Sequence, residues 1–131
     1  MMERVGSSAL PDRIVDMRDL LEAVCERPWM WGVEERYRAT CAFIDGCDAA
    51  MGGLLLHGIN WWLTERIGEH QADPWWYRIA GRRYPGLVEG GGMSWADLTP
   101  EEERRLIDDM WGELRAFWWG RSMKFAVSTF G

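Results

Sequence analysis

Two carboxylates three residues apart are the first candidates for chemistry in this sequence. Asp45 and Asp48 fall on one face of a predicted helix, inside the nearly apolar segment Ala-Phe-Ile-Asp-Gly-Cys-Asp-Ala-Ala. A pair of carboxylates in a cleft could share a proton or hold a cation. We favour a simpler interpretation, in which Asp48 is solvated and Asp45 is half-buried beside a backbone donor or a nearby arginine. The arginines in question are Arg36 and Arg38.

Cysteine and histidine are too few to predict a catalytic or metal site. The two histidines, His57 and His70, match no zinc-binding spacing. Cys41 and Cys47 lie between apolar residues, where a thiol keeps a high pKa and behaves as a small hydrophobic group. The sequence leaves open a cysteine–histidine pair whose members the fold brings together, and such a pair would make the protein an enzyme. Otherwise we predict no catalytic residue, no metal and no cofactor.

Charge and length bound the class of protein. The 131 residues carry 21 acidic and 15 basic side chains, which gives a net charge of −6. Phosphate contacts require clustered lysine and arginine, and Lys124 is the sole lysine, so no nucleic-acid partner is expected. The acid excess instead favours a basic protein partner, whose approach it would steer. The length suits one domain.

The sequence predicts a soluble, cytoplasmic protein with no membrane partner. The longest apolar stretch, 49–63, includes His57 and Asn60 and is shorter than the roughly 20 residues that a membrane span needs. Residues 1–9 show no signal-peptide pattern. The three cysteines match no metal motif and leave one unpaired in any disulfide scheme, which is typical of reduced thiols.

Tryptophan is the most distinctive feature of the composition. Ten residues are tryptophan, and eight of them come in four close pairs. The pairs are Trp29/Trp31, Trp61/Trp62, Trp75/Trp76 and Trp118/Trp119. Each indole buries roughly 200 Å², so a domain of this size cannot hide all ten. Neighbours on a helix point about 100° apart, which places Trp61 and Trp119 at the margin of the apolar stripes. Exposed indoles are typical of recognition surfaces.

Periodicity and helix-boundary residues predict five helices. The expected segments are 13–27, 33–51, 54–67, 74–80 and 100–119. A turn, Pro28–Gly32, separates the first two. Asp73 is expected to cap the fourth helix, with Pro74 in its first position. The clearest signal is Thr99-Pro100-Glu101-Glu102, a capping box with acidic residues in the first turn.

These elements predict an all-α fold, a single-domain compact bundle of about five helices. Residues 1–11 are expected to form a flexible N-terminal arm, 12–120 the helical domain, and 121–131 a C-terminal tail of coil or an edge element. A Gly-rich loop covers 81–98, with Gly90–Gly92 as its most mobile point. This loop lacks the lysine and the serine or threonine of a P-loop, so a phosphate cradle is not expected.

Short motifs between residues 20 and 80 give the chain a resemblance to a known group. The motifs are Leu20-Leu21-Glu22, Glu26-Arg27-Pro28, Met30, Gly32, Ala42-Phe43-Ile44-Asp45-Gly46, Trp62-Leu63, Arg66, Gly68 and Trp76. With the acidic last helix, they resemble a family of small actinobacterial proteins, uncharacterised or immunity-like members of toxin and conflict loci. Trp29 stands where that family usually has glycine, and Cys47 where it often has tyrosine. The resemblance implies a helical domain that binds a partner and has no known catalysis.

Our first functional hypothesis is a non-enzymatic, immunity- or inhibitor-like protein that binds a partner protein, such as a basic toxin domain. Acidic charge would speed association and aromatic anchors would slow dissociation. The expected anchors are Trp29, Trp31, Trp61 and Trp119. The expected steering charges are Glu101, Glu102, Asp108 and Asp109.

The alternative hypothesis is a small-molecule or carbohydrate-binding helical module with a tryptophan-lined pocket. The expected lining residues are Asp45, Asp48, His57, Trp75 and Trp76. A concave cluster of rings would favour this alternative, and a flat or convex patch would favour a protein partner. The sequence leaves the identity of the partner and the oligomeric state open.

Overall fold

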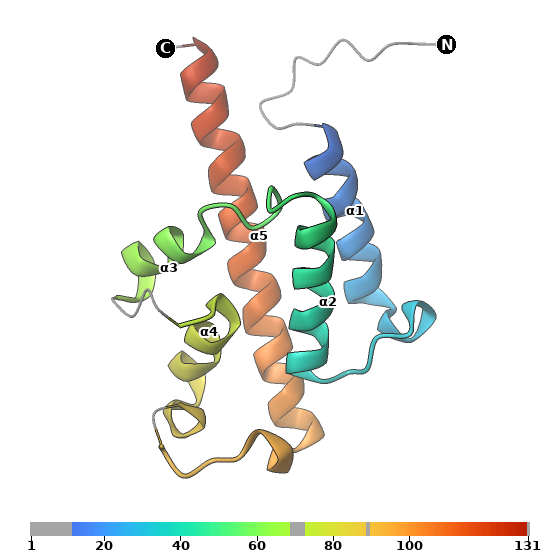
Figure 1. Cartoon of the computed structure of the whole chain (residues 1–131), viewed down its shortest axis with the longest axis vertical. Coiled ribbons are helices and arrows are strands. Elements are labelled where there is room, and N and C mark those ends of the chain that lie inside the picture. The colour runs from blue at the N-terminus through green and yellow to red at the C-terminus, as the bar shows by residue number, and fades with distance from the viewer. Residues whose placement is uncertain (1–11, 69–72, 89, 131) are drawn as a thin grey trace.

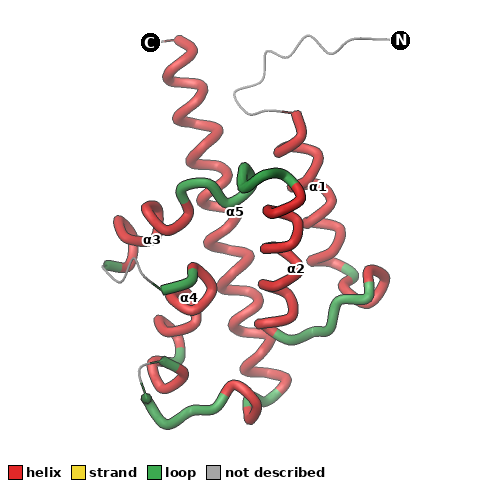
Figure 2. Tube along the Cα trace, viewed as in Figure 1, coloured by secondary structure: helices red, strands yellow, loops and turns green. Residues whose placement is uncertain are grey.

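The computed structural model describes residues 12–68, 73–88 and 90–130, with side chains described for 17–68, 73–88 and 90–119. Within these ranges the chain forms five α-helices and three short 3-10 turns, and no strand (Figures 1 and 2). The helices are α1 (Asp12–Glu26), α2 (Tyr37–Ala50), α3 (Ile59–Ile67), α4 (Trp75–Arg83) and α5 (Pro100–Phe130). The 3-10 turns are η1 (Pro28–Trp31), η2 (Pro85–Leu87) and η3 (Trp95–Asp97). The predicted all-α fold is confirmed.

Helix α5 is the axis of the fold. Figure 1 shows α1 and α2 on one side of it and α3 and α4 on the other. Its buried stripe comprises Leu106, Met110, Trp111, Leu114, Phe117 and Trp118. These residues recur at helical spacing, and each fully buried leucine stabilises the fold by about 2 kcal/mol. No helix in the described ranges is both long and apolar enough to cross a membrane.

The predicted capping box at the start of α5 is confirmed. The Thr99 hydroxyl accepts a hydrogen bond from the Glu102 amide at 3.1 Å, and the Glu102 carboxylate accepts one from the Thr99 amide at 2.9 Å. These reciprocal bonds satisfy two amides that the helix itself leaves unpaired. Helix α5 therefore has a well-defined first turn.

A buried glutamate of α5 also caps the start of α2. Glu103 accepts a hydrogen bond from the Tyr37 amide at 3.0 Å and forms an ion pair with Arg36 at 3.5 Å. Arg36 itself is extended and makes no side-chain cap. The sequence predicts a helix from Val33, but α2 begins at Tyr37, where the cap from α5 is available.

Helix α3 begins five residues later than the sequence predicts. Three glycines between α2 and α3, Gly52, Gly53 and Gly58, have positive φ, which a regular helix does not allow. Asp48 accepts a hydrogen bond from the Leu56 amide at 2.8 Å and holds this connection in place. The Trp118 indole also donates to the Leu55 carbonyl, at 3.0 Å. The connection is therefore packed onto α5.

The predicted boundaries of α4 and the predicted end of α5 are also wrong. Pro74 is the N-cap of α4 and has no side-chain cap from Asp73, and the helix continues to Arg83. Helix α5 does not end near Trp119 but continues to Phe130, so the predicted coil or edge element at 121–131 is helical through 130. A single glycine at position 120 costs a helix only about 1 kcal/mol, which is too little to end it without a proline. The predicted arm, 1–11, lies outside the described residues.

The Gly-rich loop is held by close backbone approach. The Met93 amide donates to the Gly86 carbonyl at 2.8 Å, and the Gly91 amide donates to the Val88 carbonyl at 3.1 Å. A Cβ at Gly91 would lie 2.5 Å from the Cα of Gly86, closer than atoms can pack. Glycine is needed here because two backbone segments cross, and the prediction of a simply mobile loop missed this role.

Candidate functional site

The turn η1 carries the most exposed cluster of large apolar side chains. Trp29 is 66% exposed, Met30 64% and Trp31 47%. The Met30 amide donates to the Arg27 carbonyl at 3.0 Å, the Val33 amide donates to the Pro28 carbonyl at 3.1 Å, and Gly32 closes the turn with a φ of 71°. A backbone-bonded turn thus presents three consecutive apolar side chains to solvent.

A cleft of about 230 Å³ lies beside this turn, between α1, η1, the start of α2 and the first half of α5. We call it the acid–indole cleft. Its lining residues are Val24, Cys25, Glu26, Pro28, Trp29, Glu35, Thr40, Pro100, Arg104, Ile107, Asp108 and Trp111. Segments from both ends of the described chain therefore build one concave site.

The walls of the acid–indole cleft are largely apolar. Trp111 is buried, Ile107 is partly buried, and Trp29 is exposed on η1. Pro28 and Pro100 begin η1 and α5, respectively. Aromatic and apolar walls with a few charged groups are the usual make-up of a binding pocket.

The charged groups of the cleft are predominantly acidic. Glu26 ends α1, Glu35 precedes α2, and Asp108 lies on α5, so the three carboxylates come from separate segments. Among the described residues, none of the three lies within ion-pair distance of a basic side chain. Arg104 is the one basic residue of the lining. The lining therefore has an excess of acidic charge, with three carboxylates to one guanidinium.

Cys25 is the only thiol of this lining. Burial raises the pKa of Cys25, and the charges of Glu22 and Asp108 raise it further, while Arg115 opposes them. Its thiol is therefore protonated at neutral pH and is a weak nucleophile.

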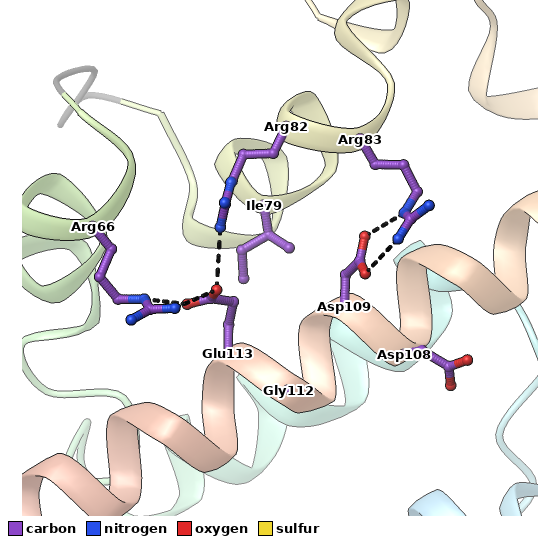
Figure 3. Close-up of a pocket in the computed structure, with 8 residues that line it drawn as sticks. All are labelled: Arg66, Ile79, Arg82, Arg83, Asp108, Asp109, Gly112 and Glu113. Carbon is purple, nitrogen blue, oxygen red and sulfur yellow. Dashed lines mark hydrogen bonds and ion pairs between the residues drawn. The ribbon is translucent and has the colours of Figure 1, made fainter.

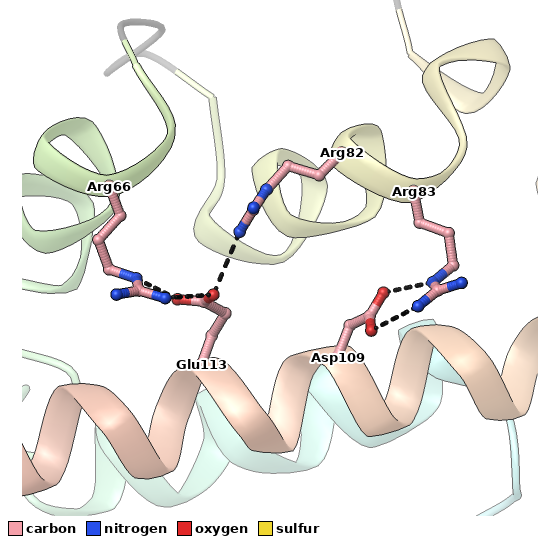
Figure 4. Close-up of polar contacts among 5 residues, drawn as sticks. All are labelled: Arg66, Arg82, Arg83, Asp109 and Glu113. Atoms are coloured by element: carbon pink, nitrogen blue, oxygen red, sulfur yellow. Dashed lines mark hydrogen bonds and ion pairs between the residues drawn. The ribbon is translucent and has the colours of Figure 1, made fainter.

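A second concavity, which we call the arginine groove, has about 660 Å³ and lies between α3, α4 and α5 (Figure 3). Its lining residues are Arg66, Ile79, Arg82, Arg83, Asp108, Asp109, Gly112 and Glu113. Among the described side chains, all of these charges except that of Asp108 are matched in ion pairs (Figure 4). Glu113 accepts two hydrogen bonds from Arg66, at 2.9 and 3.1 Å, and one from Arg82 at 3.2 Å. Arg83 donates twice to Asp109, at 2.6 and 3.0 Å.

Arg78 is buried on the same side of the molecule as the arginine groove and forms further hydrogen bonds there. Its residue is 6% exposed, and its guanidinium donates to the carbonyls of Asn60 at 2.9 Å and Gly68 at 2.7 Å. It also donates to the Thr64 hydroxyl at 3.1 Å. These acceptors lie along α3 and at its C-terminal end, where the helix dipole favours a cation. The arginines of α4 thus attach this helix to α3 and α5.

The four tryptophans expected to act as anchors are all exposed, although helical position placed only Trp61 and Trp119 at the margin of an apolar stripe. Trp61 is 63% exposed and Trp119 66%. They do not form one surface, because Trp61 belongs to α3 and lies across α5 from η1 (Figure 1). Only Trp29 and Trp31 share one turn.

The predicted steering acids differ in their surroundings. Glu101 pairs with Arg105 at 2.6 Å, Glu102 belongs to the capping box, and Asp109 pairs with Arg83. Asp108 alone among them lines the acid–indole cleft. The structure therefore brings one predicted acid, Asp108, together with one predicted anchor, Trp29.

Of the residues expected to line the alternative ligand pocket, Trp75 and Asp45 are in direct contact. Trp75 is buried, and its indole donates to Asp45 at 2.8 Å, in place of the arginine or backbone partner that we expected for that carboxylate. Burial raises the pKa of Asp45, and the hydrogen bond from Trp75 partly offsets this. Asp48 binds the Leu56 amide and is not simply solvated. Trp76 packs edge-on against Trp95 and Tyr77, and His57 is exposed. None of the five lines the acid–indole cleft or the arginine groove.

Sequence reasoning placed only Trp29 and Asp108 of this lining in a functional site, and it missed the other charged and aromatic residues of the acid–indole cleft. They are Glu26, Glu35, Arg104 and the buried Trp111, which was assigned only to the core. A usable signal was present, because Pro28 and Pro100 both mark predicted element starts beside acidic residues. The sequence gives no indication that the start of η1 and the start of α5 line the same cleft.

No protein family, curated protein or solved structure matches the chain. The function of the protein must therefore be inferred from the chemistry of the protein's own surface. Within the described residues, no group of three histidine, cysteine or acidic side chains is placed to hold a metal ion.

Proposed function

We propose that the protein is a non-enzymatic binding protein that contacts a partner protein through η1 and the adjoining acid–indole cleft. The observation that carries this proposal is the exposure of Trp29, Met30 and Trp31 together on one backbone-bonded turn. Leaving three large apolar side chains in water is unfavourable unless another surface covers them. Tryptophan and methionine are also enriched at protein interfaces.

The shape and charge of this surface favour a protein partner over a small molecule. Trp29, Met30 and Trp31 stand exposed on one short turn, where they can contact a partner, and the cleft that Trp29 lines can receive a side chain in return. The net charge of −6 and the acidic lining favour a partner with a basic surface. We propose that such a partner is blocked by this contact, in the manner of an immunity or inhibitor protein.

The test has two steps. The intact protein is first used to capture partners from lysate of its own host, and the most abundant stoichiometric partner is then produced in recombinant form. Its Kd is measured for the unaltered protein and for the Trp29→Ala/Trp31→Ala variant by calorimetry. We expect at least about tenfold weaker binding, because exposed interface tryptophans commonly contribute 1–2 kcal/mol or more to binding.

The matched control is Trp61→Ala, which removes an equally exposed indole from α3, on the other side of the molecule. This control should bind the partner with unchanged Kd. If Trp61→Ala weakens binding while the η1 double variant does not, the contact surface lies on α3 and the proposal is wrong. Matching circular dichroism spectra would establish that both variants are folded.

A further inference from the structure

We infer that the acid–indole cleft receives one arginine side chain, which the partner protein inserts beside η1. This inference depends on the proposed function for its partner, but its recognition chemistry can be tested without that partner. The cleft of about 230 Å³ is a side-chain-sized site rather than a flat contact surface. Its occupant must place positive charge near carboxylates and an apolar stem against the walls.

The distribution of the acids favours an extended cation. Glu26, Glu35 and Asp108 approach from three segments, and they are not gathered as a metal ion requires. A guanidinium carries five N–H donors in a planar fork, so it can bond to carboxylates on more than one side. A lysine ammonium is a compact point charge and matches spread carboxylates less well.

The walls match the rest of an arginine side chain. Trp29 is 66% exposed and lines the cleft, so its ring can stack with a guanidinium plane. Ile107 and Pro28 provide apolar surface for the methylene stem. An arginine therefore finds charge, a stacking face and apolar contact within one site.

Arg104 is a competing cation within the same lining and gives a second, opposite test. It lies one helical turn before Asp108 on α5 and forms no ion pair among the described residues. Its charge repels a guanidinium guest. Replacing Arg104 with glutamine should therefore tighten the binding of a cationic probe, whereas replacing the acids should weaken it.

The experiment measures binding of N-acetyl-arginine amide to the full chain by NMR, with the Trp29 indole N–H as the reporter. N-acetyl-citrulline amide is the neutral control of similar shape, and N-acetyl-lysine amide is the charged control. For the arginine probe we expect a Kd on the order of 1 mM, which is typical of a single side chain without its interface. N-acetyl-citrulline amide should bind at least about tenfold more weakly than the arginine probe, and N-acetyl-lysine amide about threefold more weakly. A tenfold difference in Kd corresponds to about 1.4 kcal/mol of binding free energy.

A pair of matched triple variants assigns the site. Glu26→Gln/Glu35→Gln/Asp108→Asn removes the acids of the cleft and should weaken binding of the arginine probe at least about tenfold. Asp19→Asn/Glu65→Gln/Asp97→Asn removes the same charge from exposed positions outside the lining and should change the Kd less than about twofold. Arg104→Gln should lower the Kd about two- to threefold.

The outcomes separate this inference from the proposed function. If citrulline binds as tightly as arginine, or if the two triple variants weaken the probe equally, the cleft does not recognise a guanidinium. Equal binding of lysine and arginine would also contradict the arginine assignment. In each case, loss of partner binding in the η1 double variant would still support the proposed function. If the arginine probe binds as expected but the double variant retains partner binding, the proposed function fails and the cleft remains an arginine site.

Discussion

The arginine groove and the acid–indole cleft share helix α5, yet they use charge in opposite ways. Asp109 faces the groove and forms a two-fold hydrogen-bonded ion pair with Arg83. Asp108, the next residue, forms no ion pair among the described residues, and Figure 3 shows its carboxylate directed away from the Asp109–Arg83 pair. Successive side chains on a helix point about 100° apart, so Asp109 lines the groove alone, whereas Asp108 lines both the groove and the cleft.

The comparison teaches that residue type alone does not distinguish a structural charge from a recognition charge. Both concavities contain arginine and carboxylates on neighbouring turns of α5. In the groove the charges join α3, α4 and α5 to one another. In the cleft none of the three carboxylates forms an ion pair among the residues with described side chains, and they line the same site as an exposed indole. Substitutions in the arginine groove should therefore change the stability of the fold, and substitutions in the acid–indole cleft should change binding.

The largest effect on stability is expected for Arg78→Leu. This change leaves the carbonyls of Asn60 and Gly68 without their buried donor, and we expect a loss of about 3 kcal/mol in the free energy of unfolding. Urea denaturation followed by circular dichroism measures it. Arg104→Leu, in the acid–indole cleft, is the control and should change stability by less than about 0.5 kcal/mol. Similar losses in the two variants would remove the proposed distinction.

A smaller effect is expected for Glu113→Gln. This residue accepts hydrogen bonds from both Arg66 and Arg82, whose side chains are about half exposed. Solvent screening limits the loss of stability to about 1 kcal/mol. Glu35→Gln removes an unpaired carboxylate from the cleft and should leave stability unchanged within about 0.3 kcal/mol. Thermal unfolding of the two variants in low salt decides whether paired and unpaired acids differ as we expect.

The smallest effect concerns the reactivity of Cys25. Because its pKa is raised, Cys25 should react with iodoacetamide more slowly than N-acetylcysteine at pH 7.5, and the difference should narrow as pH rises above 9. Arg115 lowers the pKa of Cys25, so Arg115→Gln should slow the reaction further, while Arg104→Gln should not. Peptide mapping by mass spectrometry measures the rate at this site. Faster alkylation in Arg115→Gln would contradict the assigned electrostatics.

Local signals in the sequence predicted the elements well. The Thr99–Glu102 capping box forms as expected, and the stripe from Leu106 to Trp118 is the buried face of α5. These features depend on residues within a few positions of one another, which a sequence displays directly. The late start of α2 does not follow from such a local pattern, because its cap is Glu103, 66 residues away from Tyr37.

The candidate site was predictable only in part, for the same reason. Asp108 falls opposite the apolar stripe of α5, whereas the turn around Trp29 did not itself determine whether that ring is buried or exposed. That Glu26 and Glu35 share a cleft with Asp108 depends on how α1 packs on α5, which no local pattern encodes. The burial of Trp75 against Asp45 was missed likewise, since the hydrogen bond crosses from α4 to α2.

The cap that Glu103 supplies to α2 has a consequence for synthesis of the protein. The first turn of α2 lacks this acceptor until residue 103 has left the ribosome. The acid–indole cleft also waits for Arg104, Ile107, Asp108 and Trp111, which lie in the last third of the chain. A nascent chain that ends before α5 contains η1 but not the completed site. The proposed site is therefore complete only once the first turns of α5 have left the ribosome.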